Sequence, residues 1–242
     1  MSSINVIEAG NAPFCQPGIE AAVDRLRGAQ RTSISPVDYA AADGSGVFGY
    51  YGVAQASGAT VSLAAGAHLA SLRWSDLTRV LVLLGIRAGW TITGAVTAAT
   101  PMDLRAIIAR GFTVDFTTAS TPANLAAVAN TGKFRSTMGA SLLGTNGPRI
   151  ATTGAMSGQT LTADADAFAM TSFANQPSGN ATVTQAVGVG HPMVDLYKWD
   201  PTKHPIVLQA NEGVLVQPVT AGPTTGSVKY YIEWHWAELA GF

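Results

Sequence analysis

The segment RVLVLLGIRAGWTI, residues 79–92, constrains the fold of this chain more than any other stretch. Its even positions are all apolar, whereas its odd positions also carry arginine, glycine and threonine. Successive side chains of a β-strand point to opposite faces, so this pattern predicts a strand with one continuous apolar face. A helix beginning a few residues earlier would also align several leucines, but Gly85, Gly89 and the valines disfavour it. We predict a long strand that bends at one of these glycines. Its apolar face comprises Val80, Val82, Leu84, Ile86, Ala88, Trp90 and Ile92.

The segment SVKYYIEWHWAEL, residues 227–239, alternates in the same way near the end of the chain. His235 lies between two tryptophans in the sequence, but in an extended strand both indoles point away from it. We expect the tryptophan face in the core of the protein, where each ring buries a large apolar area. Glu233 and His235 then share the polar face, available to a neighbouring strand or subunit. The predicted core face comprises Val228, Tyr230, Ile232, Trp234 and Trp236.

Short runs rich in branched and aromatic residues, separated by turn-forming stretches, fill the rest of the chain after residue 46. The segment PIVLQANEGVLVQ, residues 205–217, resembles a hairpin that turns at Asn211 to Gly213. Residues 121–130 form the only other helix candidate in this part. Many short strands with little helix predict a β-sandwich or barrel. The predicted strands cover residues 47–55, 59–63, 104–116, 133–138, 149–153, 161–170, 204–209 and 213–219.

The first 46 residues differ from this β-rich body, residues 47–242. Residues 18–28 place apolar side chains at helical spacing, and Gly28 is a plausible stop. This pattern is equally typical of a surface helix on the main domain and of an arm that docks on another subunit. The linker-like composition after it favours the arm. The residues of this segment that we expect at an interface are Ile19, Val23, Leu26 and Arg27.

The composition indicates a neutral protein that associates with others. Charged residues make up only 12% and apolar residues 47% of the chain, and the net charge is -1. A surface with so few charges favours burial against further subunits, so we expect a homo-oligomer. The charge balance predicts neither a nucleic-acid nor a membrane partner. Cys15 is the only cysteine and therefore forms no disulfide within the chain. The first residues lack the layout of a signal peptide and the apolar runs are short, so we expect a soluble protein.

Residue patterns that would indicate an enzyme are weak throughout the sequence. The stretch GASLLG, residues 139–144, comes near a nucleophile elbow, but Leu143 replaces its second glycine. Asp164 and Asp166 begin a calcium-like loop without its third acid or its glycine. Glu212, Glu233 and Glu238 are the candidates for a glycosidase pair, whose chemistry depends on a separation that sequence cannot measure. A loop could hold a metal in a jelly-roll enzyme through His191, Asp195, Asp200 and His204, although its prolines suggest a solvated loop. We expect no catalytic residue, no cofactor and no metal.

Arginine outnumbers lysine and lies at or beside the ends of predicted strands. Such arginines either solvate the open face of a sheet or form forked contacts to carboxylates and backbone carbonyls across a subunit interface. We count Arg79 and Arg87, with Glu233 and His235, among the expected interface residues. The full set comprises Arg73, Arg79, Arg87, Arg105, Arg110, Arg135 and Arg149.

The order of several segments, and the residue patterns within them, resemble a family of tailed-bacteriophage virion proteins, the head-associated decoration or cement proteins. The resemblance covers roughly residues 60–240, and residues 1–46 match no named pattern. It implies an antiparallel, jelly-roll-like β-sandwich, commonly trimeric, bound outside an icosahedral head. It offers no catalytic residues to carry over. The segments that carry it are LRWSDLTRVLVLLGIRAGWTITGAVTAA, IIARGFTVDF, KFRSTMGASLL, RIATTGAM, HPIVLQANEGVLVQ and YYIEWHWAEL.

These observations lead us to expect a structural virion protein that braces contacts between capsid subunits. Its partners would be the major capsid protein and other copies of itself, most simply in a trimer. It would be made in the host cytoplasm and located on the phage head. The alternative is a phage fibre or a carbohydrate-binding sandwich with exposed aromatics on one concave face. The aromatic candidates for that face are Tyr50, Tyr51, Tyr197 and Trp199.

Overall fold

The computed structural model divides the chain into two units, Met1–Ala42 and Asp43–Phe242. In the first unit it describes only the backbone of Val23–Asp24 and Ala29–Gln30. In the second it describes residues 49–59, 63–96, 102–123, 125, 132–134, 139–144, 147–173, 188, 190–200, 202–223 and 225–239. All structural statements below concern these residues.

The described part of the first unit contains strands where a helix was expected. Strand β1 (Val23–Asp24) pairs antiparallel with β2 (Ala29–Gln30). The helix prediction for residues 18–28 is therefore wrong at Val23 and Asp24, and its other residues lie outside the described part. A short amphipathic segment has little helical stability of its own, and β-branched Val23 is well suited to a strand.

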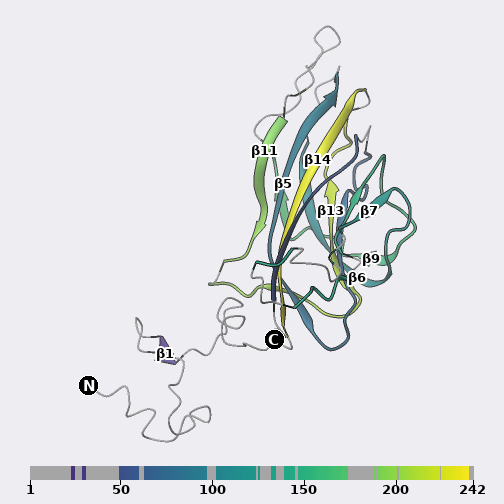
Figure 1. Ribbon diagram of the computed structural model, residues 1–242. Helices are drawn as coiled ribbons and strands as arrows, with labels where there is room; N and C mark the ends of the chain where they lie inside the picture. Colours follow the sequence, from purple (N-terminus) through teal and green to yellow (C-terminus); the bar gives the residue numbers. More distant parts are fainter. Residues whose placement is uncertain are drawn as a thin grey trace, which may run out of the picture. The chain divides into compact units, whose positions relative to one another are not determined.

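Two antiparallel sheets form the second unit (Figure 1). The smaller sheet has the order β11-β5-β14-β3, and β12 also pairs with β5. Its strands are β3 (Gly49–Ala56), β5 (Val80–Gly94), β11 (Gly190–Lys198), β12 (Ile206–Leu208) and β14 (Ser227–Leu239). The larger sheet has the order β10-β6-β13-β4-β8-β7, and β9 also pairs with β6. Its strands are β4 (Ala70–Trp74), β6 (Leu104–Val114), β7 (Ser120–Pro122), β8 (Arg149–Ala151), β9 (Thr160–Ala163), β10 (Ala169–Thr171) and β13 (Glu212–Pro218).

The strand order is that of a jelly roll, which confirms the predicted fold class. One sheet contains β3-β14-β5-β11 and the other β4-β13-β6-β10. Early strands therefore pair with late ones, β3 with β14 and β4 with β13, and the chain passes repeatedly from one sheet to the other. Two interlocked Greek keys of this kind define the jelly-roll sandwich.

The core between the sheets contains the predicted face of β14. All five residues of that face, from Val228 to Trp236, are buried in one apolar cluster. Trp234 and Trp236 are completely inaccessible to solvent. Trp90 of β5 and Trp74 of β4 join them, so both sheets contribute indoles to the core. The prediction that the tryptophans point away from His235 into the sandwich is confirmed.

A bulge at Leu84 corrects the predicted face of β5. Gly85 pairs with His235, but the next pair along β14 is Trp236 with Leu83, so Leu84 is the extra residue. An extra residue reverses which positions face the core. From Ile86 onward the even positions are in the core as predicted, whereas before the bulge the core residues are Leu81 and Leu83. Val80, Val82 and Leu84 therefore do not share a face with Ile86 to Ile92, so the predicted continuous apolar face is wrong before Gly85, although Val82 is also fully buried.

The predicted hairpin of residues 205–217 is also wrong. Strand β12 pairs with β5 in the smaller sheet, whereas β13 pairs with β4 and β6 in the larger one. Asn211, with a φ of 63°, lies in the turn between them, and its N–H donates to the Trp74 carbonyl. Because β13 is a central strand with two partners, its pairing is more extensive than a local hairpin would allow.

The two sheets differ in how their outer faces are covered. On the larger sheet, Leu215 pairs with Ile107 and Ser71 on the outer face, and these three residues are buried. Val214 and Val216 point to the opposite face. On the smaller sheet, a group of polar side chains on the middle of the outer face remains partly exposed. This face therefore offers polar side chains to a ligand or partner.

Candidate functional site

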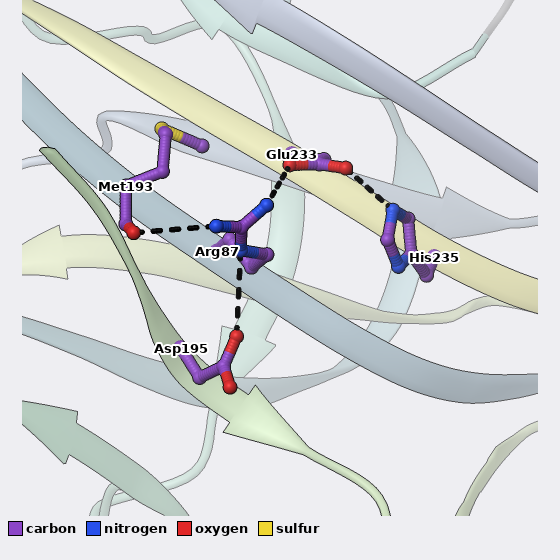
Figure 2. A network of polar contacts seen from close by, with 5 residues as sticks. All are labelled: Arg87, Met193, Asp195, Glu233 and His235. Atoms are coloured by element: carbon purple, nitrogen blue, oxygen red, sulfur yellow. Dashed lines mark hydrogen bonds and ion pairs between the residues drawn. The ribbon is translucent and has the colours of Figure 1, made fainter.

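Arg87 organises a row of polar side chains on the outer face of the smaller sheet (Figure 2). Its Nη1 donates to Oε2 of Glu233 at 3.1 Å, and its Nη2 donates to the Met193 carbonyl at 3.3 Å. Its Nε lies 3.4 Å from Oδ1 of Asp195. The other oxygen of Glu233 lies 2.7 Å from Nε2 of His235. The row therefore runs from Asp195 through Arg87 and Glu233 to His235, across three strands.

Strand register brings these residues together. Arg87 of β5 is directly opposite Glu233 of β14 on one side and Asp195 of β11 on the other. Directly opposed residues in an antiparallel sheet point to the same face with their Cβ atoms about 5 Å apart. His235 follows Glu233 by two positions on β14 and therefore shares that face.

Phe134 closes the row at its β3 end. Its N–H donates to the Tyr50 carbonyl, which places residues 132–134 beside β3. The ring lies 5.5 Å from that of His235 in an edge-on arrangement and is 57% exposed. It packs over Gly52, where an added Cβ would come within 2.6 Å of Cζ of Phe134. A glycine at position 52 is thus needed for the ring to rest on the sheet.

Within the row, the Arg87 guanidinium pairs with the carboxylates of both Asp195 and Glu233. The side chains of Arg87 and Asp195 are 42% and 50% exposed, and those of Glu233 and His235 are 24% and 33% exposed. Ion pairs this accessible add little stability, about 1 kcal/mol or less each. They do hold planar hydrogen-bonding groups in one orientation while leaving part of each group accessible to a ligand or partner.

A second polar cluster, buried at the end of β14, has Glu238 at its centre. The carboxylate accepts hydrogen bonds from Ser141 Oγ at 2.5 Å, from the Leu142 N–H at 3.0 Å and from Trp236 Nε1 at 3.1 Å. Tyr51 stacks on Trp236 and donates its hydroxyl to the Gly139 carbonyl. These hydrogen bonds attach residues 139–144 to the sandwich. The Ser141 hydroxyl thus donates to a carboxylate that has a structural role.

Burial raises the pKa of Glu238 above its ordinary value, against the opposing effect of its hydrogen bonds from Ser141, Leu142 and Trp236. The folded state therefore holds the proton more tightly than the unfolded chain does. The contribution of Glu238 to the free energy of unfolding is therefore fully present below the ordinary carboxyl pKa. It is lost as the pH rises through the raised pKa of the folded state. We expect Glu238→Gln to lack this loss, so the wild-type free energy of unfolding should fall relative to that of the variant as the pH rises. Urea denaturation of both proteins between about pH 4 and pH 8 measures this difference. A difference independent of pH would contradict the expectation.

The structure separates the residues of the proposed metal loop. His191 pairs with Trp90 and its ring lies against Phe173, on the inner side of β11. Asp195 points outward to Arg87, and Asp200 accepts hydrogen bonds from Thr202. In the described part of the chain, no group of three or more His, Cys, Asp or Glu side chains is placed to hold a metal ion.

The glutamates considered for glycoside hydrolysis do not face one another either. Glu233 lies on the outer face and Glu238 on the inner face of the same strand. Glu212 belongs to the other sheet, where its carboxylate accepts a hydrogen bond from Arg110. These three glutamates therefore do not form a pair of carboxyl groups that could flank one glycosidic bond.

Most of the arginines form contacts to carboxylates, carbonyls or an amide oxygen within the chain. The Nε of Arg73 donates to the Phe112 carbonyl, and Arg105 binds the side-chain oxygen of Gln217 through two nitrogens. Arg110 bridges two carboxylates, Asp164 and Glu212. Arg149 pairs with Asp115 and Arg87 with Glu233. Arg135 lies outside the described residues.

Of the eight expected interface residues, the structure brings three together: Arg87, Glu233 and His235. The main-chain carbonyl of Arg79 accepts the Nε1–H of Trp74, and the positive charge of the Arg79 side chain acts on Glu238. Ile19, Leu26 and Arg27, and the side chain of Val23, lie outside the described residues. The sequence prediction missed Phe134 and Met193, which reach the row through contacts between distant segments. Glu238 was detectable as a core-face residue, because the alternation of β14 continues by two positions from Trp236.

Comparison of the chain with protein-family models, curated proteins and solved structures found no match. Among the residues described, no helix has the length and apolar character needed to cross a membrane.

Proposed function

We propose that this protein is a structural virion protein of a tailed bacteriophage, a decoration or cement protein bound to the outside of the head. The observation that carries the proposal is the jelly-roll strand order, an architecture used by viral capsid domains. A fold alone does not determine function, so the low charge and the resemblance of residues 60–240 to head-associated proteins add necessary support. Among the described residues, no three His, Cys, Asp or Glu side chains come together in a way that could hold a metal ion.

In this role the protein acts by burying neutral surface against the major capsid protein. The body binds where capsid subunits meet, and residues 1–46 reach across the subunit boundary. Copies of the chain associate with one another, most simply as a trimer. Shallow contacts repeated by the symmetry of the shell sum to a strong attachment.

Co-purification with intact particles tests this function. We expect the protein in stoichiometric amounts in gradient-purified virions of the phage that encodes it. Full-length Leu26→Asp should bind particles about tenfold or more weakly, because an interface leucine contributes about 1.5 to 3 kcal/mol. Its thermal melt should match that of the wild type. Absence of the protein from purified particles would reject the function, and unaltered binding of Leu26→Asp would reject the docking role of the arm.

A carbohydrate-binding sandwich, alone or in a phage fibre, is the second candidate. The specific observation in its favour is the exposed ring of Phe134 beside the polar row. The aromatic set expected from the sequence does not form such a surface. Tyr51 is buried in the core, and Tyr197 lies against Phe168 at the inner side of β11. The Nε1–H of Trp199 donates to the Lys203 carbonyl in a loop beyond that strand.

A further inference from the structure

On the middle of the smaller sheet's outer face, small residues flank the outward side chains of β14. Three outward side chains of β14, those of Tyr231, Glu233 and His235, form a line along it. Their direct neighbours on β5 and β3 are glycine or alanine at every position except Arg87. Gly85 and Gly89 are buried and Phe134 lies over Gly52, whereas Ala54 and Ala56 are exposed. A molecule can therefore lie against the sheet on the β3 side of this line. The neighbours are Gly89, Arg87 and Gly85 on β5, and Ala56, Ala54 and Gly52 on β3.

Aromatic rings lie at both ends of the line. Tyr231 is half-buried, with the Lys229 ammonium 5.9 Å from its ring centroid, and the exposed Phe134 lies beside His235. Tyr231 and His235 are four residues apart on a strand, which corresponds to about 13 Å. This length accommodates more than one sugar ring, with the exposed Phe134 ring at one end and the Tyr231 ring, under the Lys229 ammonium, at the other.

The groups between the rings suit hydroxyls better than ions. The carboxylates of Asp195 and Glu233 alternate with the guanidinium of Arg87 and the imidazole of His235. With His235 neutral, the row carries two carboxylates and one guanidinium, and the Lys229 ammonium over Tyr231 supplies a second positive charge. Little net field therefore remains to attract a charged ligand. A hydroxyl both donates and accepts hydrogen bonds, so neighbouring hydroxyls match a row in which donors and acceptors alternate. Because the side chains already hold one another, ordering them on binding costs little.

An extended peptide fits this surface less well. Peptides that bind sheets by strand addition need an unpaired edge, and β14 is paired with β5 on one side and β3 on the other. A ligand over β14 is recognised by side chains alone, through stacking and hydrogen bonds.

We propose that the line Tyr231–Glu233–His235, with Arg87, Asp195 and Phe134 beside it, is a binding site for a neutral oligosaccharide. The site gives the protein a glycan-binding activity in addition to its proposed role on the capsid. The two are independent, since attachment to particles is measured without glycan and glycan binding without particles.

A printed array of neutral and acidic glycans, followed by calorimetry with the best neutral oligosaccharide, tests the site. We expect the full-length protein to bind neutral glycans with an affinity that changes little between about 0.05 M and about 0.5 M salt. Phe134→Ala should weaken binding about tenfold, as expected for loss of a stacking ring. Phe134→Trp should retain binding, and both variants should still attach to particles.

Met170→Ala is the matched control, because Met170 is an apolar residue of the other sheet and is 60% exposed. Its affinity for the glycan should equal that of the wild type. If Phe134→Ala melts early, Glu233→Gln replaces it as the test variant, with the same expected loss of affinity. No bound glycan, a preference for acidic glycans that disappears with salt, selection of peptides instead, or equal binding by the folded test variant would each overturn the proposal.

Discussion

Trp234→Ala should lower the free energy of unfolding by about 3 to 5 kcal/mol, as is typical for truncating a buried large aromatic side chain. Trp234 lies in the middle of β14, completely inaccessible between the two sheets. Its loss leaves a cavity in a core to which both sheets contribute. Urea unfolding monitored by circular dichroism measures the change, and the slope with denaturant should stay close to that of the wild type.

His235→Ala and Trp234→Phe are the matched controls. His235 is adjacent in sequence but lies on the outer face in a partly exposed contact with Glu233, so its loss should cost about 1 kcal/mol or less. Trp234→Phe should cost less than Trp234→Ala, since Nε1 of Trp234 has no hydrogen-bond partner among the residues described. A larger loss from His235→Ala than from Trp234→Ala would reverse the assignment of the two faces.

Glu238→Ala should have the second large effect, a loss of roughly 3 kcal/mol. The substitution leaves the Ser141 hydroxyl, the Leu142 N–H and the Trp236 indole N–H without their acceptor, and each buried donor left unpaired costs about 1 to 3 kcal/mol. Residues 139–144 should then separate from β14, which hydrogen exchange at Leu142 would detect.

Glu233→Ala provides the comparison for Glu238→Ala. Both remove a glutamate from β14, but Glu233 is partly exposed and its contacts are ion pairs at the surface, so about 1 kcal/mol or less is expected. Similar small losses from both variants would show that the buried carboxylate contributes no more than a surface one.

The elements with the clearest alternation were predicted well, because their periodicity reports burial directly. Strand β14 has its core face where the sequence placed it, and β5 begins and ends within two residues of the prediction. The errors occur where one chain segment depends on another. The bulge at Leu84 is visible only against the register of β14, and the false hairpin at Asn211 came from treating β12 and β13 as partners of each other.

The polar row shows the same limit at the level of the site. Glu233 and His235 were predicted to share a face because both belong to one strand. Their proximity to Asp195 and Phe134 depends on pairing between segments about 40 and 100 residues away. Likewise, the strand-end arginines were recognised as candidates for forked contacts, but their partners within the chain could not be identified.

The sequence by itself determined that the body is built of β-strands as a sandwich or barrel, that the tryptophans of the last strand form its core and that Glu233 and His235 point away from them. These properties follow from the two-residue period of a strand, which acts locally. Only the tertiary structure decided the jelly-roll order, the bulge in β5, the partners of Arg87 and the burial of Glu238. Each of these depends on the register between distant strands, which is selected by packing of the whole core rather than by any one segment.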